Sequence, residues 1–449
     1  MLTILSYSSL PKKHLRIRKL LQRTVDYLAK CTNKTGFRIS HEKSTIMHVY
    51  RKRSHGNIPP LLIENEPVSE VKTQRILGII FDRRLNFHAH ISKLKSDIEP
   101  RINILRAISG SKIGGHPKSL LNIYKSIARS KLLFGFPVFC GASLCQLKKL
   151  EPCHNKAIRL ALGAFPTSPT KSIMAISGIL PLQYTFWECL LKHLTTTTTT
   201  GDNSSVHSTS LKLAKEISLN QLGYRIPKIA KTHHSWSWEH TVPRVCWKLK
   251  ELGGRNTSPT VARTLLSQLQ REDFVAEDHI FTDGSKKDKK VGAAIVCNDT
   301  ISNYGLPSET TIFSAEAYAI MRVVTMPTTN DRNRRVIFSD SESVITAVQY
   351  GVSTHPWIKV IRELLIKDQS TTLCWIPGHK GIPGNEQADT AAKDALDFEL
   401  ERIAIPPSDV RNELVERILN KWRNEWWTQQ IHANGYLTEI ERKREQSLV

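Results

Sequence analysis

Residues 278–396 alternate between strand-like and helix-like runs, and this alternation constrains the fold more than any other feature of the sequence. The segments HIFTDGS and VGAAIVC are typical of two strands joined by the hairpin-like KKDKK. SAEAYAIMRVV then indicates a helix, and RRVIFSD a strand that runs directly into the helical SESVITAVQY. A strand, TTLCWIPGH, and a helix, NEQADTAAKDAL, complete the pattern. We therefore predict an α/β domain in which helices pack against a mixed sheet.

Four carboxylates occupy special places in this pattern. Asp283 and Asp340 each end a strand, Glu316 lies in the expected first turn of an apolar helix, and Asp389 lies in a helix of small residues. Each acid alone has an ordinary interpretation, such as helix capping by Asp340 or a favourable dipole interaction for Glu316. Together, four acids at strand ends and on inward helix faces repel one another unless cations neutralise them. Carboxylate oxygens suit Mg²⁺ or Mn²⁺, and two such ions can promote phosphodiester hydrolysis.

The segments IFTDGS, SAEAYAI, IFSDSESV and IPGHKGIPGNEQAD together resemble the type 1 ribonuclease H family in order, spacing and local context. The resemblance implies a ribonuclease H-like domain with a mixed five-stranded sheet and helices. It implies an endonuclease that cuts the RNA strand of RNA–DNA hybrids, uses two Mg²⁺ ions (or Mn²⁺) and leaves 5′-phosphomonoesters. It also implies that the metal ligands are Asp283, Glu316, Asp340 and Asp389.

The loop before the last helix of this pattern carries His379. By the same resemblance, His379 assists proton transfer or product release, whereas a lone histidine would ordinarily be structural or merely exposed. Its flanking glycines, Gly378, Gly381 and Gly384, are expected to keep the loop mobile. The separate basic substrate-binding helix of some cellular family members is not evident, which leaves substrate affinity to the rest of the chain.

Charge is distributed unevenly along the chain. The net charge of +23 divides into +27 for residues 1–250 (40 Lys+Arg, 13 Asp+Glu) and −4 for residues 251–449 (24 and 28). A generally basic protein would explain the total but not this asymmetry. We therefore expect the N-terminal half to bind nucleic acid through its phosphates.

The N-terminal half also resembles a known family. The segments GFRISHEKST, RILGIIFDRRLNFHAHI, LLNIYKSIARSKLLFG and QLKKLEPCHNKAIRLALGAFPTSP resemble, in this order, the region after the active site in reverse transcriptases of jockey-like non-long-terminal-repeat retrotransposons. The resemblance implies the end of a palm, a short hairpin and a helical thumb. Lys43 matches a palm lysine, although an ordinary surface lysine is an equally good interpretation.

The palm aspartates of a polymerase are missing from this pattern. Reverse transcriptases need an early palm aspartate and an Asp–Asp pair before the position of GFRIS, but no aspartate precedes Asp26 and no Asp–Asp dipeptide occurs. We therefore expect no polymerase activity and interpret the chain as the C-terminal remnant of a retrotransposon polyprotein. An inactive, nucleic-acid-binding remnant is the alternative to an active nuclease.

Five regions follow from these patterns, the third of them a polar, threonine-rich linker and connector. They are a partial palm (1–87), a helical thumb-like region (88–194), the linker and connector (195–277), the ribonuclease H domain (278–396), and a C-terminal amphipathic helix with a tail (397–449). In that last helix, tryptophans at 422, 426 and 427 suit packing better than stacking on nucleic acid.

No membrane span or persuasive signal peptide is evident, so we expect no membrane partner. Cys145, Cys153 and His154 lie close together but lack the paired spacing of a zinc site. We interpret all eight cysteines as free thiols of a reducing, intracellular compartment, nuclear or cytoplasmic.

Overall fold

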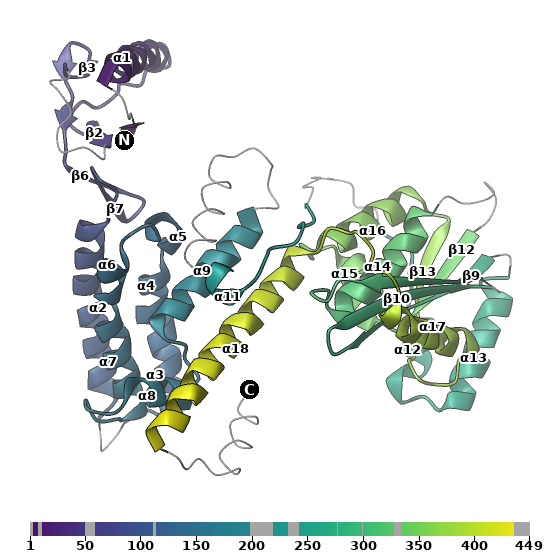
Figure 1. Cartoon of the computed structure of the whole chain (residues 1–449). Helices are drawn as coiled ribbons and strands as arrows, with labels where there is room; N and C mark the ends of the chain where they lie inside the picture. Colours follow the sequence, from purple (N-terminus) through teal and green to yellow (C-terminus); the bar gives the residue numbers. More distant parts are fainter. Residues whose placement is uncertain are drawn as a thin grey trace. The chain divides into compact units, whose positions relative to one another are not determined.

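The computed structural model describes residues 3–7, 11–49, 59–110, 114–197, 219–231, 242–275, 277–298, 300–326 and 334–434 (Figure 1). The chain divides into two compact units, Met1–Leu190 with Trp422–Val449, and Leu191–Lys421. None of the described helices has a stretch both long and apolar enough to cross a membrane.

A six-stranded sheet in the order β11-β10-β9-β12-β13-β8 forms the centre of the second unit. Its strands are β8 (Val245–Cys246), β9 (Glu277–Lys287), β10 (Lys290–Cys297), β11 (Thr300–Leu306), β12 (Arg334–Ser339) and β13 (Thr371–Trp375). β9, β10 and β11 run antiparallel, whereas β12, β13 and β8 extend the sheet in parallel from β9. The sheet is mixed, and the predicted domain supplies the expected five strands, β9 to β13, to which the segment before that domain adds a sixth. The extra strand is β8, and two residues leave no alternating pattern to detect.

Helices cover both faces of this sheet (Figure 1). One face carries α14 (Ile312–Thr325), α15 (Glu342–Tyr350) and α16 (Pro356–Lys367). The other carries α17 (Pro383–Asp394), α12 (Lys248–Leu252) and α13 (Pro259–Glu272). Short helices complete the unit: α11 (Asn220–Leu222), η3 (Gly254–Asn256) and η4 (Ala395–Asp397).

The segment before β9 belongs to the same hydrophobic core as the sheet. Leu249, Leu266, Leu269 and Phe274 are buried in one cluster with residues of the strands, and the Phe274 ring lies 6.2 Å from that of Phe338. Much of the stretch that the sequence indicated as a connector therefore packs against the sheet. Its apolar residues contribute to the stability of the whole unit.

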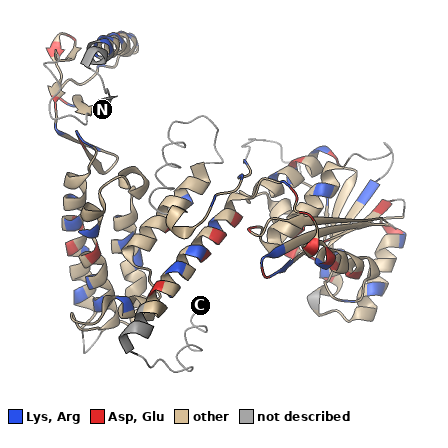
Figure 2. Cartoon of the chain, in the orientation of Figure 1, with Lys and Arg blue, Asp and Glu red and all other residues tan. Residues whose placement is uncertain are grey.

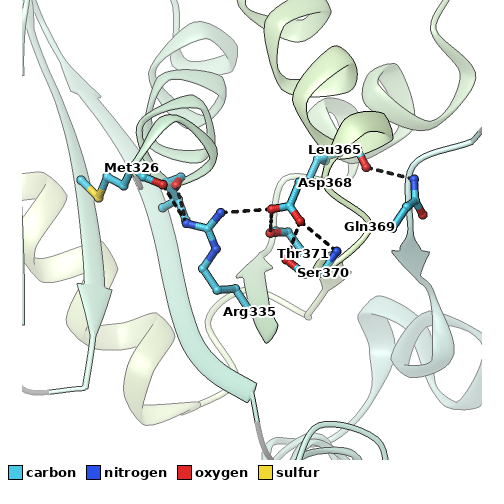
Figure 3. Close-up of polar contacts among 8 residues, drawn as sticks. Met326, Arg335, Leu365, Asp368, Gln369, Ser370 and Thr371 are labelled. Carbon is cyan, nitrogen blue, oxygen red and sulfur yellow. Dashed lines mark hydrogen bonds and ion pairs between the residues drawn. The ribbon is translucent and has the colours of Figure 1, made fainter. Parts of the chain in front are cut away.

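A buried arginine fastens the middle of the sheet (Figure 3). Arg335 at the start of β12 donates hydrogen bonds of 3.1 Å from Nη1 to the carbonyls of Val323 and Met326, where α14 ends. Its Nη2 lies 3.5 Å from Asp368, which also accepts from the Ser370 N–H at 3.0 Å. One side chain thereby satisfies carbonyls at the end of α14 and joins them to the loop before β13.

The first unit contains small sheets and a set of helices. Its strands are β1 (Thr3–Tyr7), β2 (Thr45–Val49), β3 (Leu62–Ile63), β4 (Glu66–Pro67), β5 (Ser69–Glu70), β6 (Thr73–Ile76) and β7 (Ile79–Asp82). β1, β2 and β5 form one parallel sheet, and β6 and β7 form an antiparallel hairpin. The identity of this part as a palm stays a prediction.

The rest of this unit is mostly helical. Its helices are α1 (Pro11–Lys34), α2 (His88–Ile108), α3 (Pro117–Tyr124), η1 (Lys125–Arg129), α4 (Ser130–Leu133), α5 (Phe136–Phe139), α6 (Leu144–Lys148), α7 (Glu151–Leu162), α8 (Thr170–Ser177) and α9 (Leu182–Thr197). The apolar residues along α6 and α7 are buried, at Leu147, Leu150, Ala157, Ile158 and Ala161. α7 ends at Gly163, whose φ of 65° is left-handed.

His154 has an ordinary structural role in α7. Its Nδ1 is hydrogen bonded to the Tyr124 hydroxyl, and its Nε2 lies 3.1 Å from the Leu180 carbonyl. Burial lowers the pKa of His154 to about 4, so the ring is neutral. Among the described residues, Cys145, Cys153 and His154 do not form a metal-binding group.

The long C-terminal helix α18 spans Pro407–Asn434, within the region where an amphipathic helix was predicted. Along one face of this helix, Val410, Leu414, Ile418 and Trp422 are all buried. The Trp422 ring packs 6.0 Å from that of Tyr184, which favours a packing role for this tryptophan.

Candidate metal centre

Asp283 and Asp340 lie at equivalent positions on adjacent parallel strands. Phe281 of β9 is the register partner of Phe338 of β12, and each aspartate follows two residues later. The two phenyl rings stack with centroids 5.0 Å apart below the carboxylates. The pairing of two apolar strands therefore places the two acids side by side. Asp340 follows β12 directly, as predicted, but the expectation that Asp283 ends a strand was wrong, because β9 continues to Lys287 in its hairpin with β10.

Glu316 reaches the same point from α14 because the helix packs closely on β9. A Cβ atom added to Gly284 would lie 2.6 Å from the backbone nitrogen of Glu316, so only glycine permits this approach. The helix begins at Ile312, capped by Thr311, which puts Glu316 beyond the first turn where it was expected. The interpretation of Glu316 as a partner of the helix dipole therefore loses its basis.

Ser341 connects this glutamate to the next helix. Its hydroxyl donates a 2.5 Å hydrogen bond to Glu316 Oε2 and also accepts from the Val344 N–H to cap α15. Ser341 is the cap of α15, so the alternative interpretation of Asp340 as a helix cap was wrong. Asp340 is left with its carboxylate available to the acidic cluster.

The three carboxylates of Asp283, Glu316 and Asp340 each offer an oxygen within 4.8 Å of the others. Burial, followed by the charge of Asp340, raises the pKa of Asp283 to about 8. Burial also raises the pKa of Glu316 to about 7. The hydrogen bond from Ser341 opposes this rise, and the charge of Asp340 adds to it. The pKa of Asp340 is raised by burial, although Asn385 and His379 oppose the shift. Such a cluster lacks positive charge and is suited to a divalent cation.

Asp389 belongs to a neighbouring group on α17. Asp389, His379 and Glu386 each offer a ligand atom within 4.8 Å of the others. The charge of Asp389 raises the pKa of both Asp283 and Asp340, so the two groups interact electrostatically. Lys393, one turn along the helix, forms a 2.7 Å ion pair with Asp389.

Glu386 is a residue that the sequence analysis did not select. It lies three residues before Asp389 on one helix, a spacing that puts both carboxylates on the same face and is visible in NEQAD. Its Oε1 accepts a 3.0 Å hydrogen bond from the Gly381 N–H, which ties the His379 loop to the start of α17. Asn385 was also missed; it is 1% exposed and hydrogen bonds to Asp340.

The loop that carries His379 packs tightly against the acids. A Cβ atom at Gly378 would lie 2.4 Å from Asp340 Oδ2, and one at Gly384 would lie 2.4 Å from the Phe281 ring. His379 itself is exposed, with a left-handed φ of 53°, and Gly381 has a φ of 67°. Gly378 and Gly384 therefore serve close packing, and the expected mobility of the loop stays a prediction.

The five residues selected from the sequence thus fall into two adjoining groups. Asp283, Glu316 and Asp340 form the more buried group, and Asp389 and His379 form the more exposed one with Glu386. Oxygen donors dominate both groups, and carboxylate oxygen is the preferred ligand of Mg²⁺ and Mn²⁺. The donor set fits hard divalent cations at both places.

Two comparisons with known proteins bear on this site. The sequence pattern of the RNase H family matches residues 276–397. The chain is also similar to the probable RNA-directed DNA polymerase from transposon X-element of Drosophila melanogaster, with 27% identity over 105 residues. That alignment covers 23% of this chain and only 12% of the length of the relative.

Proposed function

Because residues 276–397 form an RNase H domain, we propose that the chain cuts the RNA strand of RNA–DNA hybrids internally and leaves 5′-phosphomonoesters. The observation that carries this proposal is the meeting of Asp283, Glu316 and Asp340 within 4.8 Å at one edge of the sheet. One buried and two half-buried carboxylates in such proximity are costly in a fold unless they serve a cation. RNase H domains in general use divalent metals, which suits this donor set.

We assign the ligands by their grouping. Asp283, Glu316 and Asp340 would hold one Mg²⁺, and Asp389 would hold a second beside Asp340, with Mn²⁺ able to replace either. When bound, the pair of cations supplies activation of the attacking water and stabilisation of the departing 3′ oxygen. The raised pKa values of Asp283 and Glu316 mean that cation binding displaces protons from these side chains.

The chain's own residues orient the carboxylates and transfer protons. Ser341 fixes Glu316 through its hydroxyl, and Asn385 fixes Asp340, so both carboxylates keep one orientation. His379 is exposed beside Asp389 and Glu386, where its imidazole can take up or deliver a proton at the leaving group. Selection of RNA over DNA requires contact with the 2′-hydroxyl of the cut strand.

The test uses the full chain with an end-labelled RNA–DNA hybrid and Mg²⁺. We expect internal cuts in the RNA strand, and no cuts in the DNA strand, in duplex DNA or in duplex RNA. The Asp340→Asn variant, purified in the same way, serves as the negative control and should be inactive. If the parent protein binds the hybrid but leaves both strands uncut, the alternative of an inactive nucleic-acid-binding remnant is favoured.

The charge asymmetry supports a second role for residues 1–250. Their net charge is +27, and Lys and Arg occur on several helices of the first unit (Figure 2). We propose that this half holds nucleic acid by neutralising phosphates, which also accommodates its proposed descent from a palm and thumb.

Polymerisation is not proposed for these 449 residues, which contain no Asp–Asp dipeptide. A primed template with nucleotides and Mg²⁺ should therefore show no extension by the purified chain. Template-directed incorporation would contradict this expectation.

A further inference from the structure

Two cysteines face each other across the edge of the sheet. Cys246 of β8 and Cys374 of β13 are register partners on adjacent parallel strands. Partners in register point to the same face, and adjacent strands lie about 4.8 Å apart. Disulfides join Cα atoms separated by roughly 4.4–6.8 Å, so the spacing of adjacent strands falls within the range that a disulfide spans.

The two thiols already interact and differ in accessibility. Cys374 is fully buried, whereas Cys246 is partly exposed. A hydrogen bond from the Cys374 thiol lowers the pKa of Cys246 to about 7, outweighing the effect of burial. The backbone N–H and the ammonium of Lys248 add to this lowering. Cys246 is therefore the more reactive thiol of the pair, and Cys374 is the neighbouring thiol that can react with it afterwards.

We propose that Cys246 and Cys374 are a disulfide-forming pair that hydrogen peroxide oxidises. The Cys246 thiolate attacks the peroxide, so that an S–O bond forms, the O–O bond breaks and water leaves after protonation. The Cys374 sulfur then attacks the Cys246 sulfur, the S–S bond forms, and hydroxide leaves and takes up the thiol proton. Two thiols lose two electrons in total, and one hydrogen peroxide becomes two waters.

The disulfide would join the shortest strand of the sheet to its neighbour. β8 has only two residues, and β13 is its neighbour in the sheet. β8 leads directly into α12, and α13 follows, so a covalent link at Cys246 would fix this whole segment against the core. The pair is independent of the carboxylate centre, so the inference does not depend on the proposed nuclease activity.

A nearby cysteine provides the matched control. Cys297 on β10 is partly exposed, like Cys246, but its register partners are Ile280 and Thr300, and burial raises its pKa. It has the same chemistry without a neighbouring thiol in register. Cys297→Ser should leave the oxidation of the Cys246–Cys374 pair unchanged.

The experiment treats the full reduced chain with one equivalent of hydrogen peroxide and maps cysteine states by mass spectrometry after non-reducing digestion. We expect peptides containing Cys246 and Cys374 to be linked, with the loss of two hydrogens, and dithiothreitol to reverse the link. Cys246→Ser should abolish the link, and Cys297→Ser should retain it. The oxidised parent should melt about 5 °C higher than its reduced form, and Cys246→Ser should show no such rise.

Other outcomes would overturn the proposal. One is oxidation of Cys246 only to a sulfenic or sulfinic acid while Cys374 remains a free thiol. The other is a disulfide between Cys246 and a cysteine other than Cys374. Because Cys246 is partly exposed, its serine variant should keep the parent's circular dichroism spectrum, which separates a missing link from a misfolded chain.

Discussion

Asp409 in the first turn of α18 accepts two hydrogen bonds from Thr311, the residue that caps α14. Its Oδ2 takes the Thr311 backbone N–H at 3.1 Å, and its Oδ1 takes the hydroxyl at 3.2 Å. Asp409 is 2% exposed, so nothing replaces these bonds if the carboxylate is removed. The C-terminal helix thereby holds the start of the helix that carries Glu316.

Asp409→Ala should lower the free energy of unfolding by about 3 kcal/mol, because it leaves a buried N–H without its charged acceptor. Asp409→Asn should lose less, since the amide oxygen still accepts one bond. Urea denaturation of both variants measures the difference, with the exposed Asp394→Ala as a control that should match the parent. Equal midpoints for Asp409→Ala and the parent would contradict the anchoring role.

Asp283→Asn should abolish hybrid cleavage and leave the fold intact. The substitution removes a ligand, but it also removes a carboxyl group whose pKa is raised to about 8 by burial and then by the charge of Asp340. Without metal, the unfolded carboxyl ionises near pH 4 and the folded one near pH 8, so the parent loses stability as pH rises between these values. The urea midpoint of the variant should therefore exceed that of the parent more at pH 8 than at pH 5. A variant that cuts at the parent rate would refute the assignment.

Cleavage should require Mg²⁺ or Mn²⁺ and should stop when a chelator is added. Ca²⁺ should support it poorly, because it accepts looser geometry around the same oxygens. The Mg²⁺ concentration for half-maximal rate should rise as pH falls from 8 to 6, since protons compete for Asp283 and Glu316. Full activity in chelator would rule out the metal mechanism.

Glu386→Gln should weaken the response to Mg²⁺ by about tenfold if its group with Asp389 and His379 contributes to the second cation. His379→Ala should instead lower kcat by about 100-fold with little change in KM, as expected for proton transfer. Metal titrations and steady-state rates distinguish the two effects. The exposed Asp394→Asn on the same helix should behave as the parent does in both assays.

Hybrid affinity should depend on the basic first unit. Replacing the exposed Lys125, Lys148 and Lys149 together by glutamine should weaken binding and make its salt dependence shallower, by up to about one power of salt for each phosphate that is no longer neutralised. Binding titrations between low and moderate salt measure the slope. An unchanged slope would indicate that these lysines do not bind nucleic acid.

More of the candidate site than of the surrounding fold could be predicted from the sequence. Asp340 follows the apolar β12 and Asp283 follows an apolar run within β9, so their meeting could be predicted once the two strands were paired in parallel. Ser341 was missed as a cap because aspartate and serine cap helices equally well, and only the folded backbone selects between neighbours. Glu386 was missed because a glutamate in the first turn of a polar helix resembles any solvated acid. The two-residue β8 has no pattern of its own, since its strand conformation depends on β13.

The position of β8 in the chain has a consequence for folding. Val245 pairs with Leu373, which lies 128 positions later (373 − 245). As synthesis proceeds from the N-terminus, β8 leaves the ribosome before every other strand of its sheet, yet its neighbour β13 is the last strand to emerge. Closing so long a loop for two residues of pairing makes this pairing a late step of folding. Until then, the outer edge of β13 is an open template for other chains, and the arrival of β8 removes it.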